Sequence, residues 1–276
     1  NVAFHEADVL PMRNRRIWQR EAGVRAEWVD AAELRRMEPA LTEDLIGGLY
    51  YPEEAHLYAP AYVRALEEAC RRTGVTIAEG VNGLTIQEWE RGIVLQGGPF
   101  RSLHGETLVL CSGAWSAVWQ EPLGVRLPVY PIRGQICAYP SAYGEVRHMV
   151  FSSQGYAVGK RNGSLVCGAS EDSAGFDASV TETGINRLKR WSARLIPALQ
   201  ARETHHVWAG LRPATQDGFP FLGPLDGAKR VICAFGHYRN GILLSPATAK
   251  AVGDWTEGRE VPRYMQAFDP MRFTTV

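Results

Sequence analysis

The sequence predicts an α/β or α+β fold with one large or two modest domains. Helical and strand patterns alternate along the 276 residues, with glycine-rich turns between them. Two short apolar strands, within residues 107–119 and 231–256, each end in glycines that lead into a helical pattern. With 45% hydrophobic residues, a chain of this length can bury a sizeable core.

Two helices are predicted in the first quarter of the chain. Residues 30–38 form the first, because Asp30 can accept hydrogen bonds from the free N–H groups of the opening turn and Pro39 stops the helix. Residues 60–72 form the second, in which apolar side chains recur at helical spacing until Gly74 ends it.

Strand patterns fill the intervals that follow. Residues 75–78 predict a strand directly after the second helix, as in a parallel sheet, and residues 84–89 and 92–95 predict a small antiparallel meander with its turn at 90–91. Residues 107–111 are continuously apolar, as expected for a strand that is covered on both faces. The remaining patterns are strands at 129–139, 146–170 and 230–235 and helices at 185–195 and 242–256.

Composition excludes several classes of protein. Thirty basic residues balance thirty acidic ones, so no overall field favours nucleic acid or an anionic membrane. No apolar run approaches the roughly 18 residues that span a bilayer. The seven histidines lack the spacing of metal ligands, so we expect no metal. The cysteines form no C-x-x-C pair and have apolar neighbours, which indicates buried, reduced thiols in a cytoplasmic protein. They are Cys70, Cys111, Cys137, Cys167 and Cys233.

The two junctions from strand to glycine to helix are candidate ligand sites. In open α/β sheets, ligands bind at the carboxyl ends of strands, where helix N-termini present free N–H groups. The second junction has Gly236 and Gly241 on either side of a His-Tyr-Arg-Asn cluster, which is a polar loop between an apolar strand and an apolar helix. The alternative interpretation is that these glycines only turn the chain and bind no ligand.

Arg212 lies in an otherwise apolar run, residues 207–220. Because burying an unpaired charge is costly, we expect its guanidinium to have an anionic partner. A ligand carboxylate held by a bidentate pair is one candidate. An internal salt bridge is the other, and the sequence leaves both open.

Five segments, taken in order, resemble the glycine oxidase and D-amino-acid oxidase family of flavoproteins, and the glycine oxidases of thiamine biosynthesis in particular. These segments extend over most of the chain in the expected order and spacing. They are Val129–Gln135, Gly155–Val158, Leu165–Ser170, Trp208–Gly218 and Gly236–Thr248.

The resemblance implies roles for individual residues. Arg212 would clamp the substrate carboxylate, Tyr156 would hydrogen-bond the same group, and Arg239 would lie near both the carboxylate and the flavin. Val81 would contact the adenine side of FAD, and Ser112 and Gly113 would lie under the cofactor. Gly210 stands near the position of the flavin-linked cysteine of sarcosine oxidases, so the FAD is expected to be non-covalent. The isoalloxazine ring would lie along the backbone of Gly236, His237, Tyr238, Arg239, Asn240, Gly241, Ile242 and Leu243.

The implied reaction is the oxidation of glycine or a similar small amino acid to an imine, which water converts to an oxo acid and ammonia. The flavin accepts the hydride and dioxygen reoxidises it to give hydrogen peroxide. A D-amino-acid or sarcosine oxidase is an alternative within the class. A non-catalytic fragment that binds small carboxylates or a partner chain is the alternative from another class. Analogy with related oxidases also favours a homo-oligomer.

The family opens with a G-x-G-x-x-G turn that binds the FAD pyrophosphate. Residues 1–60 contain no such turn, so we expect this chain by itself to bind FAD weakly. The resemblance divides the chain into interleaved domains. Residues 60–122 and 204–258 would form part of a Rossmann-like FAD domain, and residues 1–59 and 123–203 an antiparallel-sheet substrate domain.

Overall fold

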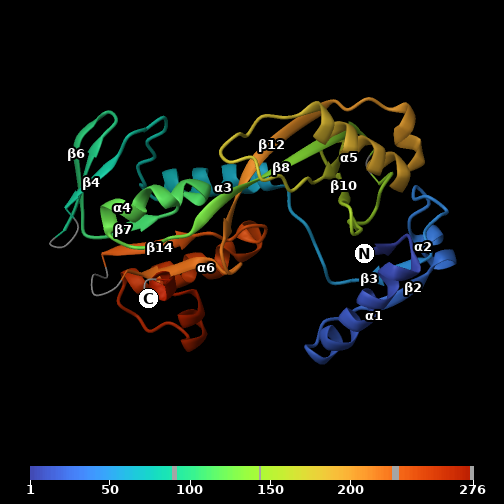
Figure 1. The fold of residues 1–276 in the computed structure, drawn as a ribbon, viewed down its shortest axis with the longest axis horizontal. Helices are drawn as coiled ribbons and strands as arrows, with labels where there is room; N and C mark the ends of the chain where they lie inside the picture. The colour runs from blue at the N-terminus through green and yellow to red at the C-terminus, as the bar shows by residue number, and fades with distance from the viewer. Residues whose placement is uncertain (89–91, 143, 226–229, 274–276) are drawn as a thin grey trace. The chain divides into compact units, whose positions relative to one another are not determined.

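The computed structural model describes residues 1–88, 92–142, 144–225 and 230–273. The chain divides into two compact units, each of which is described by itself (Figure 1). The first unit comprises residues 1–58, 133–172 and 177–210, and the second comprises residues 59–132, 173–176 and 211–276. Two of the boundaries fall inside long strands, β8 (Val129–Pro140) and β12 (His206–Thr215).

The N-terminal part of the first unit is a small antiparallel sheet with two helices. Its strands lie in the order β1 (Val2–Ala3), β3 (Gly47–Tyr50) and β2 (Glu27–Asp30). The predicted helix is confirmed as α2 (Ala31–Met37), and the Asp30 carboxylate accepts a hydrogen bond from the Glu33 N–H at 2.8 Å. Helix α1 (Glu6–Glu21) was not predicted, because Pro11 interrupts its pattern although the structure accommodates it.

The larger sheet of the first unit has five strands in the order β12, β8, β11 (Ser164–Gly168), β10 (Tyr156–Lys160) and β9 (Val150–Phe151). Helix α5 (Glu182–Leu195) begins three residues before its predicted start, because the Thr181 hydroxyl caps the Gly184 N–H at 3.2 Å. A short 3₁₀ helix, Pro197–Ala201, follows it. The core contains Leu188 and Trp191 of α5 together with Leu165 of β11, all buried.

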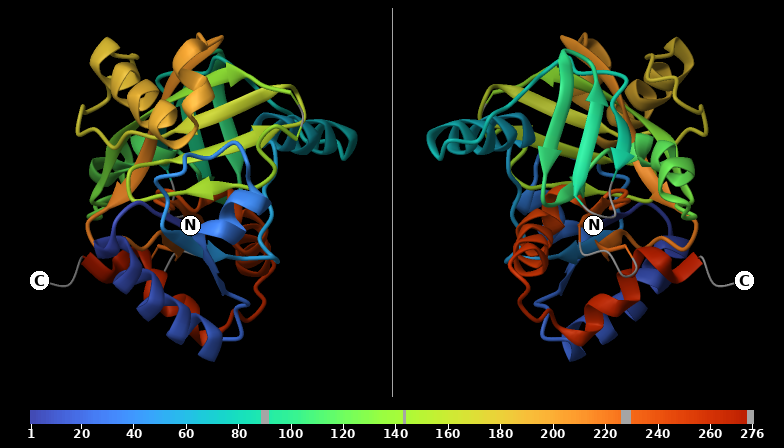
Figure 2. Two further views of the ribbon diagram at one scale, coloured as in Figure 1. Left: turned by 90° about the vertical axis from the view of Figure 1, so that its right-hand side faces the viewer. Right: turned by 90° about the vertical axis from the view of Figure 1, so that its left-hand side faces the viewer.

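The second unit contains a three-stranded sheet in which β14 (Val231–Phe235) is central. It pairs with β7 (Leu108–Leu110) in parallel and with β13 (Phe221–Pro224) antiparallel. The predicted meander is a separate sheet of β4 (Thr85–Glu88), β5 (Ile93–Gly97) and β6 (Phe100–Gly105), visible on the right of Figure 2. The helices are α3 (Ala59–Arg72), α4 (Gln120–Leu123) and α6 (Gly241–Thr256), with 3₁₀ turns at Gly113–Trp119, Arg263–Phe268 and Pro270–Phe273.

Two predictions are corrected by the structure. Residues 75–78 are not a strand: Val75 is 51% exposed, and the segment joins none of the described sheets that would give a strand its hydrogen bonds. The cysteines are not all buried, since Cys111 is exposed and Cys70 half-buried. The predicted turn at 90–91 lies outside the described residues. Among the described residues, no helix is both long and apolar enough to span a bilayer.

Candidate functional site

Two chain segments of the second unit reach the same edge of the β7–β14 pair. Because these strands are parallel and Leu110 pairs with Cys233, both have their carboxyl ends on one side. The chain turns there at Gly113, with φ of 55°, and at Gly236, with φ of 83°. Residues with a side chain rarely adopt this left-handed backbone conformation, so glycine suits both turns. The two predicted junctions therefore share one edge, where ligands of open α/β sheets bind.

The loop after β14 lies against the end of β12. The Tyr238 N–H donates to the Pro213 carbonyl at 3.0 Å. A Cβ on Gly236 would lie 2.7 Å from Cγ2 of Thr215, so the backbones approach too closely for a larger residue. This contact brings the half-buried Arg212 segment beside the exposed Arg239 loop, two candidates that are 27 positions apart in the sequence.

His237 holds the loop to α6. Its Nε2 lies 3.0 Å from the hydroxyl of Thr248, five residues beyond the exposed Leu243. Burial lowers the pKa of His237, which keeps the imidazole neutral at physiological pH. The resemblance implies that the backbone of residues 236–243 lines the cofactor, and this hydrogen bond indicates that the His237 side chain fixes that loop.

The start of α6 is apolar and exposed. Ile242 is 42% exposed and Leu243 77%, and the Asn240 side chain makes no capping hydrogen bond. Helix geometry gives the N–H groups of residues 241–243 no acceptor within the helix, and the Leu244 N–H is the first to donate to a helical carbonyl, that of Asn240. An apolar surface beside backbone donors at a strand's carboxyl edge is suited to a planar aromatic cofactor with polar edges.

Tyr156 belongs to the first unit, where its ring lies over Gly168 of the neighbouring strand. The two residues are paired across β10 and β11. A Cβ on Gly168 would lie 2.8 Å from both Cζ and Oη of Tyr156. On the other side, β9 places the Phe151 ring 5.6 Å from the tyrosine ring, centroid to centroid. Gly168 and Phe151 thus define where the phenol lies.

Of the remaining candidates, Val81 lies away from this edge in sequence, whereas Ser112 directly precedes the Gly113 turn and Gly210 precedes Arg212 by two positions on β12. Val81 contacts the turn between β5 and β6, since a Cβ on Gly98 would be 2.8 Å from its Cγ1. Gly210 is exposed and lies within β12. The Ser112 hydroxyl accepts a hydrogen bond from Trp119 Nε1 at 2.8 Å. In the described part of the chain, no three His, Cys, Asp or Glu side chains gather in a way that could hold a metal ion.

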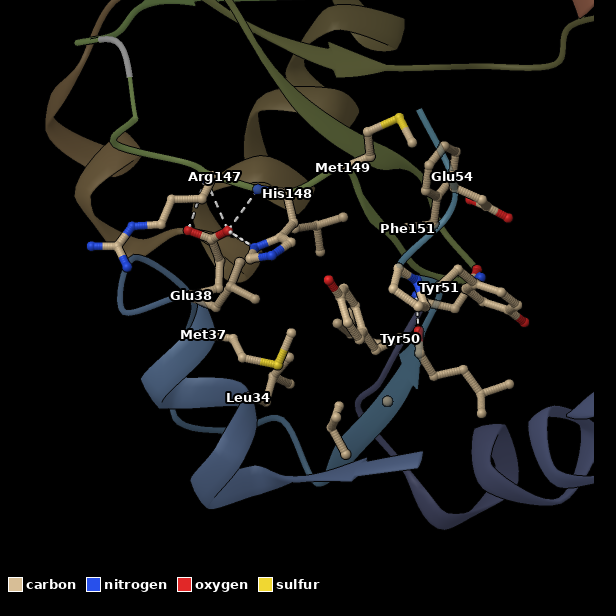
Figure 3. Close-up of a pocket in the computed structure, with 18 of the residues that line it drawn as sticks. Leu34, Met37, Glu38, Tyr50, Tyr51, Glu54, Arg147, His148, Met149 and Phe151 are labelled. Atoms are coloured by element: carbon tan, nitrogen blue, oxygen red, sulfur yellow. Dashed lines mark hydrogen bonds and ion pairs between the residues drawn. The ribbon is translucent and has the colours of Figure 1, made fainter. Parts of the chain in front are cut away.

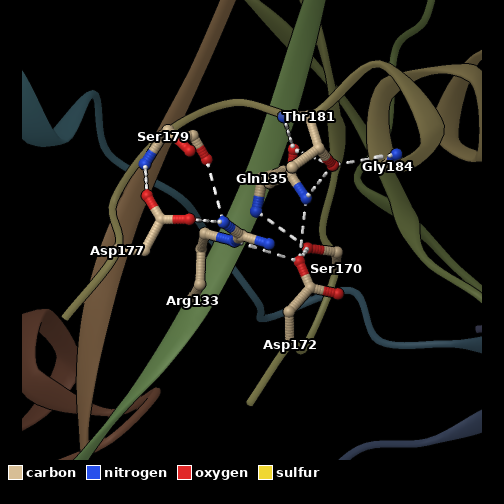
Figure 4. Close-up of polar contacts among 8 residues, drawn as sticks. All are labelled: Arg133, Gln135, Ser170, Asp172, Asp177, Ser179, Thr181 and Gly184. Atoms are coloured by element: carbon tan, nitrogen blue, oxygen red, sulfur yellow. Dashed lines mark hydrogen bonds and ion pairs between the residues drawn. The ribbon is translucent and has the colours of Figure 1, made fainter. Parts of the chain in front are cut away.

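The Arg133-Gly134-Gln135 motif anchors the segment that joins β11 to α5 (Figure 4). Arg133 Nη1 donates to Asp177 at 2.8 Å, and Gln135 Nε2 donates to Asp172 at 2.8 Å. The side-chain oxygen Oε1 of Gln135 also accepts a hydrogen bond from the Thr181 N–H at 2.7 Å. Burial tends to raise the pKa of Asp172, but hydrogen bonds and the Arg133 charge outweigh it and lower the pKa, so the carboxylate stays ionised.

The fold and these segments match one known family. The model of the FAD dependent oxidoreductase family covers residues 1–255, and the chain belongs to that family.

The similar proteins agree with this assignment. The chain is 35% identical to glycine oxidase from Geobacillus kaustophilus, over 98% of this chain and 70% of that protein. It is also 35% identical to the bifunctional protein ThiO/ThiG from Synechocystis, over 90% of this chain but only 38% of that protein. The crystal structure of the Geobacillus kaustophilus glycine oxidase superposes with a TM-score of 0.91 and 32% identity, over 98% of this chain and 73% of that one. The flavoprotein fold predicted from the sequence is confirmed.

Sequence reasoning missed several residues that shape the site. Gly168 and Phe151 fix the position of Tyr156, and Thr248 holds His237. Gly155 directly precedes Tyr156 and Gly168 is its partner in the neighbouring strand, and these two glycines were a signal that the backbone is crowded there. No local pattern identified Phe151, and the Gly236–Thr248 segment included Thr248 without giving it a role, because their partners are set by strand pairing and by the helix start.

Proposed function

We propose that this protein is an FAD-dependent oxidase of glycine or a similarly small amino acid, with Arg212, Tyr156 and Arg239 as its substrate-binding residues. Support comes from the approach of the Arg212 strand to the Arg239 loop at the carboxyl edge of the parallel strands. The names of the similar proteins, glycine oxidases, point to the same substrate. The second unit would contain most of the residues that bind FAD.

The residues at the β7–β14 edge fit a non-covalent FAD. Residues 236–243 would lie along the ring system, with Ser112 and Gly113 beneath the cofactor and Val81 on its adenine side. Bound FAD supplies a two-electron acceptor that dioxygen can reoxidise. Gly210 offers no nucleophile for a covalent link. We also propose, on analogy, a cytoplasmic location and a homo-oligomer.

The side chains supply orientation rather than chemistry. A guanidinium such as Arg212 can bind a carboxylate with two parallel hydrogen bonds, which fixes the direction of the Cα–H bond. Tyr156 would add a third hydrogen bond to the carboxylate. In the overall reaction, the amino acid loses two electrons and two protons to give an imine, and water then releases an oxo acid and ammonia. Dioxygen takes up the two electrons and two protons and becomes hydrogen peroxide.

The test is an absorbance spectrum of the protein as its gene encodes it, with added FAD and then anaerobic glycine. Bound-flavin bands that bleach with glycine are expected, and Arg212→Met should reduce bleaching at a fixed glycine concentration while leaving flavin bound. The exposed Arg187 of α5 provides the control, Arg187→Met, which should bleach normally. Parallel titrations with sarcosine and D-alanine distinguish the alternative substrates. A protein that binds carboxylates but never bleaches would favour the non-catalytic alternative.

A further inference from the structure

Glu38 is a charged residue buried almost completely, with 1% of its surface exposed, directly after helix α2. The Arg147 N–H donates to both oxygens of its carboxylate, at 2.9 Å to Oε2 and 3.1 Å to Oε1. The His148 N–H donates to Oε2 at 2.9 Å. His148 Nδ1 also lies 2.9 Å from Glu38 Oε2 (Figure 3). The carboxylate therefore gathers three donors from two consecutive residues that are more than a hundred positions away.

Two of these three donors are backbone N–H groups, so the carboxylate holds the main chain and not only a side chain. A buried carboxylate is costly unless donors compensate it, so moving the backbone at 147–148 would leave the Glu38 charge unsatisfied. A flexible side chain could adjust to restore the contact, but a main-chain N–H cannot move without the chain. Glu38 consequently fixes the position of residues 147–148 relative to α2.

The position of residues 147–148 also determines where β9 (Val150–Phe151) begins, because the strand starts two residues later. β9 is only two residues long and lies at the end of the five-stranded sheet, with β10 as its neighbour. Its register pairs Phe151 with Tyr156 and Val150 with Ala157. So short an edge strand contributes few hydrogen bonds of its own. It therefore depends on its two flanking segments: the turn after it, where the Ser152 N–H donates to the Gly155 carbonyl at 2.8 Å, and the segment that leads into it.

Packing secures only one of the two β9 residues firmly, since Val150 is buried in the core whereas Phe151 is half-buried. A cavity of about 280 Å³ in the first unit is bordered by Glu38, His148, Met149 and Phe151 (Figure 3). Open space beside Phe151 leaves that face of β9 without close packing. The hydrogen bonds to Glu38 on one side and the Tyr156 ring on the other therefore add to the core packing of Val150 in holding the strand.

We propose that Glu38 is a positioning residue for substrate binding: by fixing residues 147–148 it sets β9, and through Phe151 it sets the Tyr156 phenol. This inference rests on the proposed function only in assigning the substrate carboxylate to Tyr156. The anchoring of β9 by Glu38 is independent of that assignment and can be measured without turnover.

The primary variant is Glu38→Gln, which keeps the shape but removes the charge and one acceptor oxygen. Amide hydrogen exchange at Phe151 and Tyr156 should accelerate, whereas exchange in α5 should not change. Affinity for acetate, followed by nuclear magnetic resonance titration, should weaken. With glycine as substrate, KM should rise on the order of tenfold with a smaller change in kcat, because the displaced phenol binds the carboxylate less well.

Two further variants keep the test informative if Glu38→Gln folds poorly. Glu38→Asp retains the charge and should show a smaller rise in KM. His148→Ala removes only the imidazole contact, leaves both backbone donors, and should have a partial effect on exchange at Phe151. The matched control is Glu145→Gln in the same connecting segment, whose carboxylate accepts from Ser141 and Arg202. It should lower stability without altering acetate affinity or exchange at Phe151.

Unchanged exchange at Phe151 in Glu38→Gln would overturn the anchoring. If Glu38→Gln shows faster exchange at Phe151 but unchanged acetate affinity and KM, the link to Tyr156 is overturned. The link is also overturned if KM rises as much in the control Glu145→Gln as in Glu38→Gln. Failure of the proposed function would be seen separately, as a wild-type protein that oxidises no small amino acid. In that case the exchange and acetate measurements would still decide the inference.

Discussion

Replacing Gly168 with alanine is expected to displace Tyr156 and weaken substrate binding. The new Cβ would lie 2.8 Å from Cζ and Oη of Tyr156 and 3.2 Å from Cγ1 of Ile136. Non-bonded carbon atoms prefer about 3.5–4.0 Å, so the phenol must move by roughly 0.7–1.2 Å. A displacement of about 1 Å in a positioning group can cost on the order of a hundredfold in rate. We therefore expect kcat/KM for glycine to fall between about tenfold and a hundredfold, mainly through KM.

The protein should still fold, because overpacking of this kind costs about 1–3 kcal/mol. The assay is the initial rate of peroxide formation against glycine concentration, together with thermal unfolding of each variant. Gly105→Ala on strand β6 is the control, since its Cβ would lie at an ordinary 3.7 Å from the Thr107 carbonyl oxygen. It should leave kcat/KM unchanged.

A double-mutant cycle with Tyr156→Ala tests whether the effect passes through the phenol. In that background the added methyl group meets no ring, so Gly168→Ala should cost little further activity. A folded Gly168→Ala protein with wild-type KM would refute the reasoning. An equal loss of activity in the presence and absence of the Tyr156 ring would refute it as well.

Three further predictions concern stability and the cofactor. Arg133→Met should lower the free energy of unfolding by roughly 3 kcal/mol, as measured by urea unfolding. This is the lower end of the loss expected when a buried ion pair is broken, because Asp177 is half exposed. Burial tends to raise the pKa of Asp217, but hydrogen bonds, chiefly from Arg272, outweigh it and lower the pKa. The stabilisation that ionised Asp217 provides is therefore complete above the unfolded-state pKa of this carboxyl and is lost as pH falls through its lower folded-state pKa. The difference in Tm between wild type and Asp217→Asn should accordingly vanish in strong acid. Gly236→Ala should weaken FAD binding in a fluorescence titration, because its φ is 83° and its Cβ would lie 2.7 Å from a methyl group of β12; FAD affinity equal to wild type would contradict this.

Local signals in the sequence located most of the secondary structure. Asp30 marked the start of α2, and Gly74 marked the end of α3. These features depend on a few neighbouring residues, so the sequence reveals them directly. The strand expected at 75–78 failed for the complementary reason. A strand needs a neighbour to pair with, and sequence periodicity does not show whether one is present.

The order and spacing of motifs determined the family, because each motif combines residues that the flavoprotein fold needs at fixed positions along the chain. Only the tertiary structure decided which residues meet. The Pro213–Tyr238 contact, the packing of Tyr156 on Gly168 and the burial of Glu38 against residues 147–148 all join positions far apart in the sequence. A glutamate after a helix ordinarily suggests a solvated end, and its burial followed only from the long-range hydrogen bonds that compensate its charge. Such contacts are fixed by strand register and packing, which leave no periodic trace in the residues themselves.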